Sequence, residues 1–208
     1  MNKLLLRSLV LIAVVIFFIT PAFAVKKSGT PTKYIVKLKT VKLLNGDGAW
    51  ITVFDGISSP LDIASVSSGA NQLVGDFLNG LNVPDGTYTQ AKVQPDATFT
   101  IKGIVDGYAT DGGTIYPNNI NPDDDEWACT SKLEGTEGTP ADCTLTITDK
   151  HAPEEQGPWT FDPIVVKNGV ADRKIRVSFT VADAVTDIEA THYIYPDEPT
   201  IEVVSIAK

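Results

Sequence analysis

The densest group of potential metal ligands in the sequence is the acidic run at residues 121–126. It reads NPDDDE, and the carboxylates of Asp123, Asp124, Asp125 and Glu126 are the hard oxygen ligands that Ca²⁺ prefers. A calcium loop of the common type has alternating acids, a Gly and a distal Glu, and this run lacks that spacing. A solvated acidic loop is therefore the competing interpretation. A structural calcium ion is the one cofactor for which the sequence offers candidate ligands.

Residue types that serve hydrolytic catalysis are present, but they form no recognisable motif. Beyond residue 24 the chain has the histidines His151 and His192, several serines and many carboxylates. A Ser-His-Asp hydrolase of the common α/β type presents its nucleophile in a G-x-S-x-G turn, and no such stretch occurs. A glycosidase needs only two carboxylates, and 26 acidic residues make chance pairs inevitable. We expect no catalytic residues and a non-enzymatic protein, with an extracellular hydrolase as the least favoured alternative.

Two tryptophans lie in or beside irregular stretches of the sequence. Trp127 follows the acidic run, and Trp159 follows a proline-rich segment. Aromatic rings on loops can stack on sugar rings, so both are candidates for binding a glycan. The competing interpretation is that Trp159 and Phe161 cover an edge of the core. A third tryptophan, Trp50, lies in an alternating segment and is predicted to face the core.

Cys129 and Cys143 are the only cysteines of the chain. In an exported protein, thiols meet an oxidising environment, so we expect a disulfide between them. Closing a loop of about 15 residues stabilises a fold by roughly 3 kcal/mol in the chain-entropy model. The alternatives are a metal pair and a catalytic thiol. Neither is favoured, because no histidine or further cysteine lies at ligand spacing.

The first 24 residues have the pattern of a secretory signal peptide: a basic start, an apolar middle and a small-residue end. Ala22 and Ala24 fit the A-x-A pattern, which predicts cleavage before Val25. The apolar run falls short of the roughly 20 residues that span a bilayer, and no later segment is apolar enough to do so. No cysteine follows the run for a lipid anchor. We therefore expect a secreted, periplasmic or cell-surface protein without a transmembrane segment.

The chain is acidic, with 17 Lys and Arg against 26 Asp and Glu. Cleavage would remove Lys3 and Arg7, which leaves 15 cations against 26 anions and a formal net charge of −11. Such a surface repels nucleic acid, so we expect none as a partner. Neither a dinucleotide-binding nor a phosphate-loop signature occurs. The expected partner is a protein or a glycan outside the cytoplasm.

Alternation of apolar and polar residues predicts a series of short strands. Residues 33–44 alternate, with a change of phase between Thr40 and Val41 that indicates a bulge. Residues 45–48 read NGDG, a hairpin turn. The clearest strand is the segment around residues 175–181, and the irregular apolar spacing of residues 60–80 predicts one or two short helices.

These elements predict an all-β protein, an antiparallel β-sandwich of transthyretin-like or immunoglobulin-like type. We expect a flexible N-terminal arm at residues 25–33 and a single domain at residues 34–208. Residues 106–142 are rich in Gly, Pro, Asn and Asp and predict a long irregular insertion. The N-terminal strand is also a candidate for self-association, because an extended segment can pair with the sheet edge of a neighbour.

The order of features between residues 34 and 104 resembles the bacterial exported domain-of-unknown-function 4382 family. A first strand is followed by the Trp-containing strand GAWITVF, by PLDIASV, and by LNVPDGTYTQAKV with its Leu-x-x-Pro-x-Gly-x-Tyr pattern. The resemblance implies a transthyretin-like sandwich in the periplasm or on the cell surface. It implies no catalytic residues. We therefore expect a non-enzymatic module for assembly or partner binding, with carbohydrate- or calcium-dependent ligand binding as the alternative.

Overall fold

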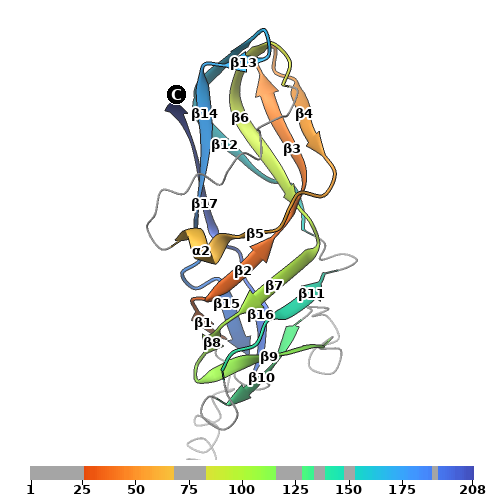
Figure 1. The fold of residues 1–208 in the computed structure, drawn as a ribbon, viewed down its shortest axis with the longest axis vertical. Coiled ribbons are helices and arrows are strands. Elements are labelled where there is room, and N and C mark those ends of the chain that lie inside the picture. Colours follow the sequence, from red (N-terminus) through yellow and green to blue (C-terminus); the bar gives the residue numbers. More distant parts are fainter. Residues whose placement is uncertain (1–25, 68–82, 116–127, 134–138, 148–152, 189–191) are drawn as a thin grey trace, which may run out of the picture.

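The computed structural model describes residues 26–67, 83–115, 128–133, 139–147, 153–188 and 192–208. Strands account for 69% of these residues, and their antiparallel sheets curl into a barrel-like or sandwich-like arrangement, which confirms the predicted all-β fold class. The molecule is elongated, with an upper and a lower part along its long axis (Figure 1). The C-terminus lies at the upper end.

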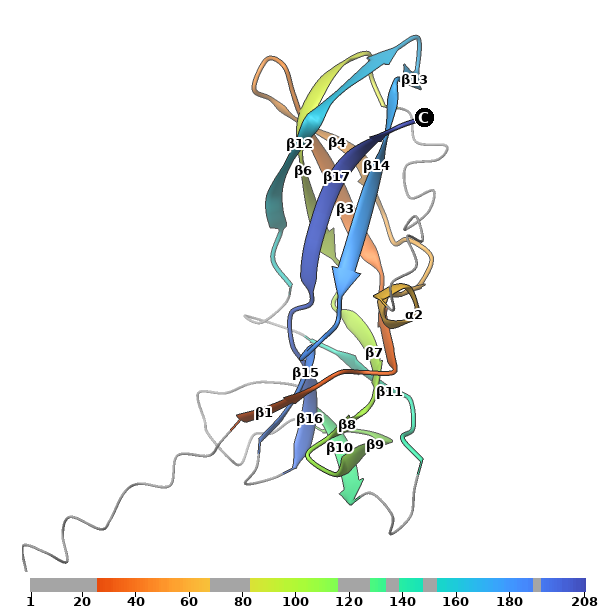
Figure 2. The same cartoon turned by 90° about the vertical axis from the view of Figure 1, so that its left-hand side faces the viewer.

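The upper part is a sandwich of two unequal sheets. Its larger sheet has five strands and its smaller sheet has two, so the smaller sheet covers only part of the larger one (Figure 2). In sheet order, the larger one consists of β13 (Val170–Ala171), β12 (Gln156–Lys167), β6 (Gly86–Pro95), β3 (Leu38–Asn45) and β4 (Trp50–Asp55). The smaller one consists of β14 (Arg173–Thr180) and β17 (Thr200–Ala207).

The lower part contains a four-stranded and a six-stranded sheet. The first consists of β11 (Cys143–Thr146), β7 (Thr98–Lys102), β2 (Lys33–Val36) and β5 (Leu61–Asp62). The second consists of β1 (Lys26–Gly29), β15 (Val185–Ile188), β16 (Tyr193–Pro196), β10 (Ala128–Leu133), β9 (Tyr108–Ile115) and β8 (Ile104–Val105). The short helix α2 (Ile63–Ser67) lies beside both parts. It falls within the segment predicted to be helical, and residues 68–82 lie outside the described residues.

The change of phase in the first strand marks the passage of the chain from the lower part to the upper part. Tyr34 and Val36 are buried in the lower part, whereas Val41 and Leu43 are buried in the upper part. The register with β6 shifts between Leu38 and Thr40, where Lys39 is an extra residue on β3, next to the change of phase predicted from the sequence. A bulge turns the side chains of one continuous segment toward a different core.

The predicted hairpin turn after β3 is confirmed. The backbone N–H of Asn45 donates to the carbonyl of Ala49 at 2.9 Å, and the side-chain oxygen of Asn45 accepts from the N–H groups of Asp47 and Ala49. Gly48 has a φ of 79°, which a glycine adopts without steric cost. The turn places Trp50 opposite Leu44.

Trp50 is not in the core, and the sequence prediction is wrong for this residue. Its ring is half-buried, and the Lys92 Nζ lies 4.7 Å from the ring centre. The pairing with Leu44 explains this position, because alternate residues of a strand face opposite sides of the sheet. Trp50 therefore lies on the outer face with the lysine, and Ile51 faces the core.

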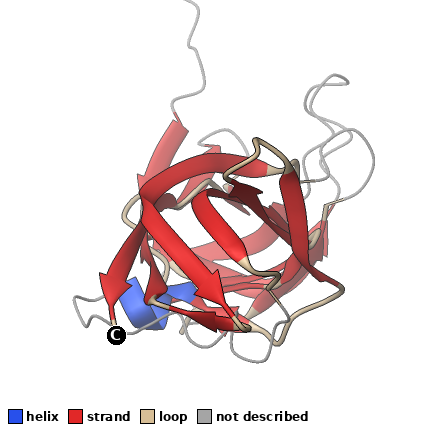
Figure 3. Ribbon diagram, turned by 90° about the horizontal axis from the view of Figure 1, so that it is seen from above, coloured by secondary structure: helices blue, strands red, loops and turns tan. Residues whose placement is uncertain are grey.

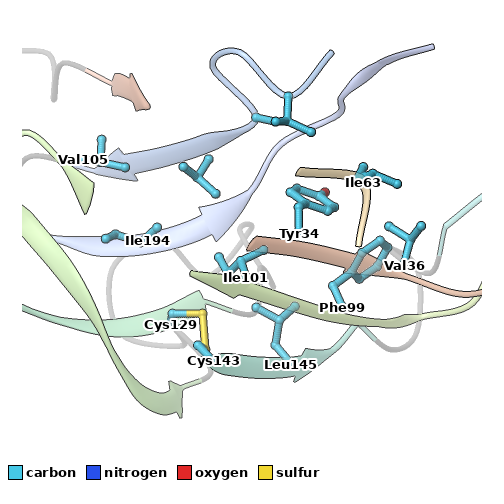
Figure 4. Close-up of a cluster of buried hydrophobic side chains, with 13 residues drawn as sticks. Tyr34, Val36, Ile63, Phe99, Ile101, Val105, Cys129, Cys143, Leu145 and Ile194 are labelled. Carbon is cyan, nitrogen blue, oxygen red and sulfur yellow. A yellow bond between two sulfur atoms is a disulfide. The ribbon is translucent and has the colours of Figure 1, made fainter. Parts of the chain in front are cut away.

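Two apolar clusters form the core, one in each part. The upper cluster includes Tyr88 and Phe161 between the two sheets. The lower cluster surrounds the disulfide and includes Tyr34, Phe99 and Ile101 (Figure 4). Seen along the long axis, the strands surround a common interior (Figure 3). The interior between the two clusters is where the candidate site lies.

The structure differs from the flexible arm predicted at residues 25–33. Residues 26–29 form β1, which pairs with β15, and Lys33 begins β2. Because β1 has no large apolar side chain, its position depends mainly on backbone hydrogen bonds to β15. Lys27 adds an ion pair with Asp106 at 2.6 Å. Gly29 allows a close approach, because a Cβ there would lie 2.8 Å from the carbonyl oxygen of Ile104.

The predicted irregular insertion at residues 106–142 is wrong for two of its segments. Residues 108–115 and 128–133 form β9 and β10, which pair with each other within the six-stranded sheet. The sequence of β9 lacks a regular apolar alternation, because Gly112 and Gly113 occupy its centre. At Gly113 a Cβ would overlap the Thr130 hydroxyl, so a larger residue there would require the Thr130 side chain to move.

Candidate functional site

An apolar cavity of about 510 Å³ lies in the described part of the chain, between the two sheets of the upper part and above the lower cluster. Its volume is within the range of small-molecule binding sites, roughly 300–1,000 Å³. Strands β14 and β17 form one side, and the five-stranded sheet forms the other. Because two strands cannot cover a five-stranded sheet, the facing side chains do not meet everywhere, and the cavity opens between them.

The wall on the five-stranded sheet comes from three adjacent strands. Val41 and Leu43 on β3, Ala91 and Val93 on β6, and Trp159 on β12 line the cavity. The pairs Val41 with Val93, Leu43 with Ala91, and Trp159 with Ala91 are direct cross-strand neighbours. Ala91 lies in the middle of this set. A small side chain at this position leaves room between two larger neighbours.

The opposite wall comes from the alternating residues of β14 and their neighbours on β17. Ile175, Val177 and Phe179 line the cavity, as do Ile201 and Val203. Val177 pairs with Val203, and Phe179 pairs with Ile201. The strand predicted most clearly from the sequence is therefore confirmed, and its apolar face borders the cavity. Ile175, Val177 and Phe179 are only half-buried, as expected for side chains that face a space.

The floor of the cavity is the upper surface of the lower cluster. Tyr34 and Phe99 contact each other edge to face, with ring centres 6.3 Å apart. The Tyr34 hydroxyl donates a hydrogen bond to the backbone oxygen of Asp197 at 3.0 Å. Burial raises the pKa of Tyr34 well above its ordinary value, and the negative charges of Asp197 and Glu198 add to the effect. Tyr34 is therefore a neutral donor fixed at the base of the site.

The polar lining residues are concentrated near one end of the cavity. Glu154 and Gln156 come from the start of β12, and Asp197 and Glu198 come from the connection between β16 and β17. The side chain of Asp197 is held in place, since it accepts from the Thr186 hydroxyl at 3.0 Å. Glu154, Asp197 and Glu198 are exposed residues that line the cavity, and we call the end that they border its mouth.

The structure places some of the site residues predicted from the sequence and does not describe others. Trp159, a glycan-binding candidate, lies in the cavity wall, whereas Trp127 lies outside the described residues. The calcium candidates at residues 123–126 also lie outside the described residues, as do the signal cleavage residues Ala22, Ala24 and Val25. No group of three metal-ligating side chains occurs in the described ranges. Cys129 and Cys143 form the predicted disulfide, with their Cα atoms 6.0 Å apart.

Sequence reasoning missed most of the lining residues. Val177 and Leu43 lie in segments whose alternation predicts strands, but the residues of a packed core have the same alternation. A bend between two clusters, a two-stranded sheet and a small residue at Ala91 together create the space. Each of these depends on strand pairing, so no local signal in the sequence identifies the cavity.

Asp187, His192 and Ser131, residue types that can form a catalytic triad, lie close together in the lower part. The carboxylate of Asp187 is fully buried, and the Oδ2 lies 3.2 Å from the Nδ1 of His192, whose ring stacks on Tyr108. The Ser131 hydroxyl donates to the backbone oxygen of His192 and not to its ring. Ser131, His192 and Asp187 are therefore not arranged as a Ser-His-Asp triad, in which the serine bonds to the imidazole.

We expect Asp187 to make the fold less stable as the pH rises through the acidic range. Burial raises the pKa of its carboxyl group, an effect that His192 only partly offsets, and Asp106 and Lys27 act in opposite directions. The folded protein therefore holds the Asp187 proton more tightly than the unfolded chain. The contribution of this group to the unfolding free energy is greatest below its unfolded pKa of 3.8 and falls until the pH exceeds the raised value.

The variant Asp187→Asn removes this dependence while keeping the shape of the side chain. Urea midpoints of the two proteins, measured from about pH 3 to pH 7, should diverge as the pH rises, with the variant relatively more stable at the upper end. Comparing the difference between the proteins cancels the contributions of the other carboxylates. A constant difference across this range would contradict the prediction.

Comparison of the chain with protein families, with curated proteins and with solved structures found no match. The family resemblance inferred from residues 34–104 therefore stays a prediction. Among the described residues, no helix has the length and apolar character needed to cross a membrane. The geometry of the cavity is thus the basis for the functional proposal.

Proposed function

We propose that this chain is an exported, non-enzymatic binding module that takes up an elongated apolar ligand between the sheets of its upper part. The observation that carries the proposal is the cavity of about 510 Å³ lined mainly by aliphatic and aromatic side chains. Removing apolar surface from water is favourable, so a ligand that covers the apolar walls of the cavity gains binding free energy. A few polar groups at one end suit the orientation of such a ligand.

Export is supported by the signal-peptide pattern and is compatible with the disulfide. Disulfides persist in oxidising compartments and are rare where thiols are kept reduced. Cys129 and Cys143 are both fully buried and joined. The location that we propose is therefore the periplasm, the cell surface or the medium.

The lining favours an apolar ligand over the glycan considered from the sequence. A sugar ring offers many hydroxyl groups, and each needs a hydrogen-bond partner when it leaves water. The walls of the cavity offer Val41, Leu43, Val177 and similar side chains beside Trp159. Trp159 therefore lies in apolar surroundings, where its ring contacts an aliphatic chain more favourably than a sugar.

Assembly through the N-terminal strand remains a prediction that the cavity does not require. In the structure β1 pairs with β15 of its own chain, and the ion pair between Lys27 and Asp106 adds to this docking. A strand held by backbone hydrogen bonds can exchange with the same strand of a second copy. The ligand-binding proposal rests on the upper part alone and does not depend on this exchange.

The proposal predicts that the mature chain binds a neutral apolar probe. N-phenyl-1-naphthylamine, whose fluorescence rises in apolar surroundings, should bind the chain from Val25 to Lys208 with saturable, single-site behaviour. The variant Val177→Phe fills the space next to Val203 and should weaken probe binding at least about tenfold, because the cavity no longer accommodates the ring system.

The matched control is Val204→Phe. It introduces the same side chain on the paired strand, and Val204 is opposite Arg176 and is not a lining residue. This variant should bind the probe like the unmodified chain, and circular dichroism should show both variants folded. Probe binding that is non-saturable, or that is equally affected by the two variants, would refute the proposed site.

A further inference from the structure

The mouth of the cavity has a charge pattern that the aliphatic walls do not explain. Glu154, Asp197 and Glu198 all line the cavity, and among the described lining residues there is no Lys, Arg or His. The first carboxylate comes from the segment before β12 and the other two come from the segment before β17. The fold thus brings negative side chains from two distant parts of the sequence to one end of the apolar space.

These three carboxylates differ from the neighbouring carboxylate of Glu155, which forms ion pairs with lysines. Glu155 forms ion pairs with Lys42 at 2.5 Å and Lys92 at 3.1 Å, on the outer face of the sheet. Within the described part of the chain, no ion pair involves Glu154, Asp197 or Glu198. The protein therefore neutralises the glutamate outside the cavity and leaves the mouth negative.

The hydroxyl group of Tyr34 lies at the same end of the cavity as the mouth and, like the carboxylates there, offers acceptors to a ligand. The hydroxyl hydrogen of Tyr34 is donated to the backbone oxygen of Asp197. The Tyr34 oxygen then offers lone pairs, as do the three carboxylates. A ligand group near this end of the cavity meets acceptors on several sides. A carboxylate or phosphate of a ligand finds no cationic partner among the described lining residues.

We infer that the ligand is a single-chain apolar molecule with a cationic amine at one end, its chain between β14 and β6 and its amine among Glu154, Asp197 and Glu198. The inference rests on the proposed function, because it assigns the polarity of the ligand in the same cavity. Opposite charges attract at the mouth, and the apolar chain accounts for the rest of the affinity. Fatty acids and phosphate-bearing lipids are excluded as preferred ligands by the same charge.

Displacement of N-phenyl-1-naphthylamine by three probes with one chain length tests the inference. Dodecylamine, dodecan-1-ol and dodecanoate, each below its micelle-forming concentration at pH 7, share the apolar chain and differ in head-group charge. We expect dodecylamine to displace the probe at a concentration at least about tenfold lower than dodecanoate, with the alcohol between them. Raising the salt concentration should reduce this difference, because exposed charges are screened.

Two double variants separate the mouth from the general acidity of the protein. Glu154→Gln with Glu198→Gln removes two charges from the mouth, and Glu155→Gln with Glu202→Gln removes two charges outside the cavity lining. Asp197 is kept, because it accepts from the Thr186 hydroxyl. The first double variant should lose most of the preference for dodecylamine and bind dodecan-1-ol as before. The second should keep the preference.

The outcomes distinguish the two proposals. Failure of all three compounds and of the naphthylamine probe to bind would refute the apolar-ligand function itself. Equal binding of the three, or preference for dodecanoate, would overturn the amine assignment and leave the apolar site in place. An equal loss of preference in both double variants would show that net charge, and not the mouth, attracts the amine, which also overturns the assignment.

Discussion

Replacing Tyr88 with alanine is expected to lower the free energy of unfolding by about 3–5 kcal/mol, the range for removing a large aromatic side chain from a core. Tyr88 is only 1% exposed and belongs to the upper cluster. It lies on β6, with Asn45 of β3 on one side and Ile164 of β12 on the other. Its loss therefore leaves a cavity at the centre of the larger sheet, where neighbouring strands restrict relaxation.

The hydroxyl group of Tyr88 accounts for a smaller part of this effect. It donates to the backbone oxygen of Pro84 at 2.8 Å, which ties the turn before β6 to the strand. Tyr88→Phe keeps the ring and should cost about 1 kcal/mol, the usual net value of a hydrogen bond. Urea unfolding followed by tryptophan fluorescence measures both variants, and a change of midpoint without a change of slope indicates altered stability alone. If the two variants lose equal stability, the hydrogen bond and not the ring stabilises the sandwich.

The motif that suggested a family resemblance has a physical explanation in this fold. In LNVPDGTYTQAKV, Tyr88 fills the upper cluster and bonds to Pro84, while the Asp85 carboxylate accepts from the N–H groups of Asn168 and Gly169 at 2.9 and 3.0 Å. These backbone hydrogen bonds lower the pKa of Asp85. Asn168 has a φ of 52°, so the turn that Asp85 holds has a conformation that few residues adopt. The sequence pattern thus reports a turn that joins β6 to the β12–β13 connection.

Sequence alternation predicted the strands that bury one face and failed where a strand lacks a period of two in its apolar residues. The alternating residues around Val177 predicted β14, because burial of one face imposes a period of two. β1 has two lysines, a serine and a glycine, and its order comes from pairing with β15, which leaves no apolar pattern to detect. In β9 the adjacent residues Ala109 and Thr110 are both buried and the centre is occupied by glycines, so its sequence has no period of two. Tertiary pairing therefore decided the structure of both segments.

The cavity was beyond sequence prediction for a different reason. Inward-facing residues such as Ile175 and Leu43 have the same pattern whether they touch each other or face a space. The size of the space depends on how much of the five-stranded sheet two strands can cover, and on Ala91 at its centre. The mouth likewise combines Glu154 with Asp197, residues far apart in the sequence. Only the three-dimensional arrangement brings these charges to one end of an apolar wall.

Removal of the disulfide is expected to lower the free energy of unfolding by roughly 3 kcal/mol in the chain-entropy model. Cys129 lies on β10 of the six-stranded sheet and Cys143 on β11 of the four-stranded sheet, so the bond joins the two sheets of the lower part. Both residues are fully buried in the fold. The bond restricts the loop between them in the unfolded chain, and this raises the free energy of the unfolded state.

The double variant Cys129→Ala with Cys143→Ala measures this effect without leaving a free thiol. Its urea midpoint should fall, and its unfolding slope should rise, because an unfolded chain without the cross-link exposes more surface. The single variant Cys129→Ala, kept reduced, retains the second sulfur atom and shows how much of the loss is packing. Since the lower cluster around Ile101 contacts both cysteines, the double variant should lose more stability than cross-link removal alone. A loss below about 1 kcal/mol would show that the unfolded chain is already restricted over residues 129–143 and that the bond adds little to the fold.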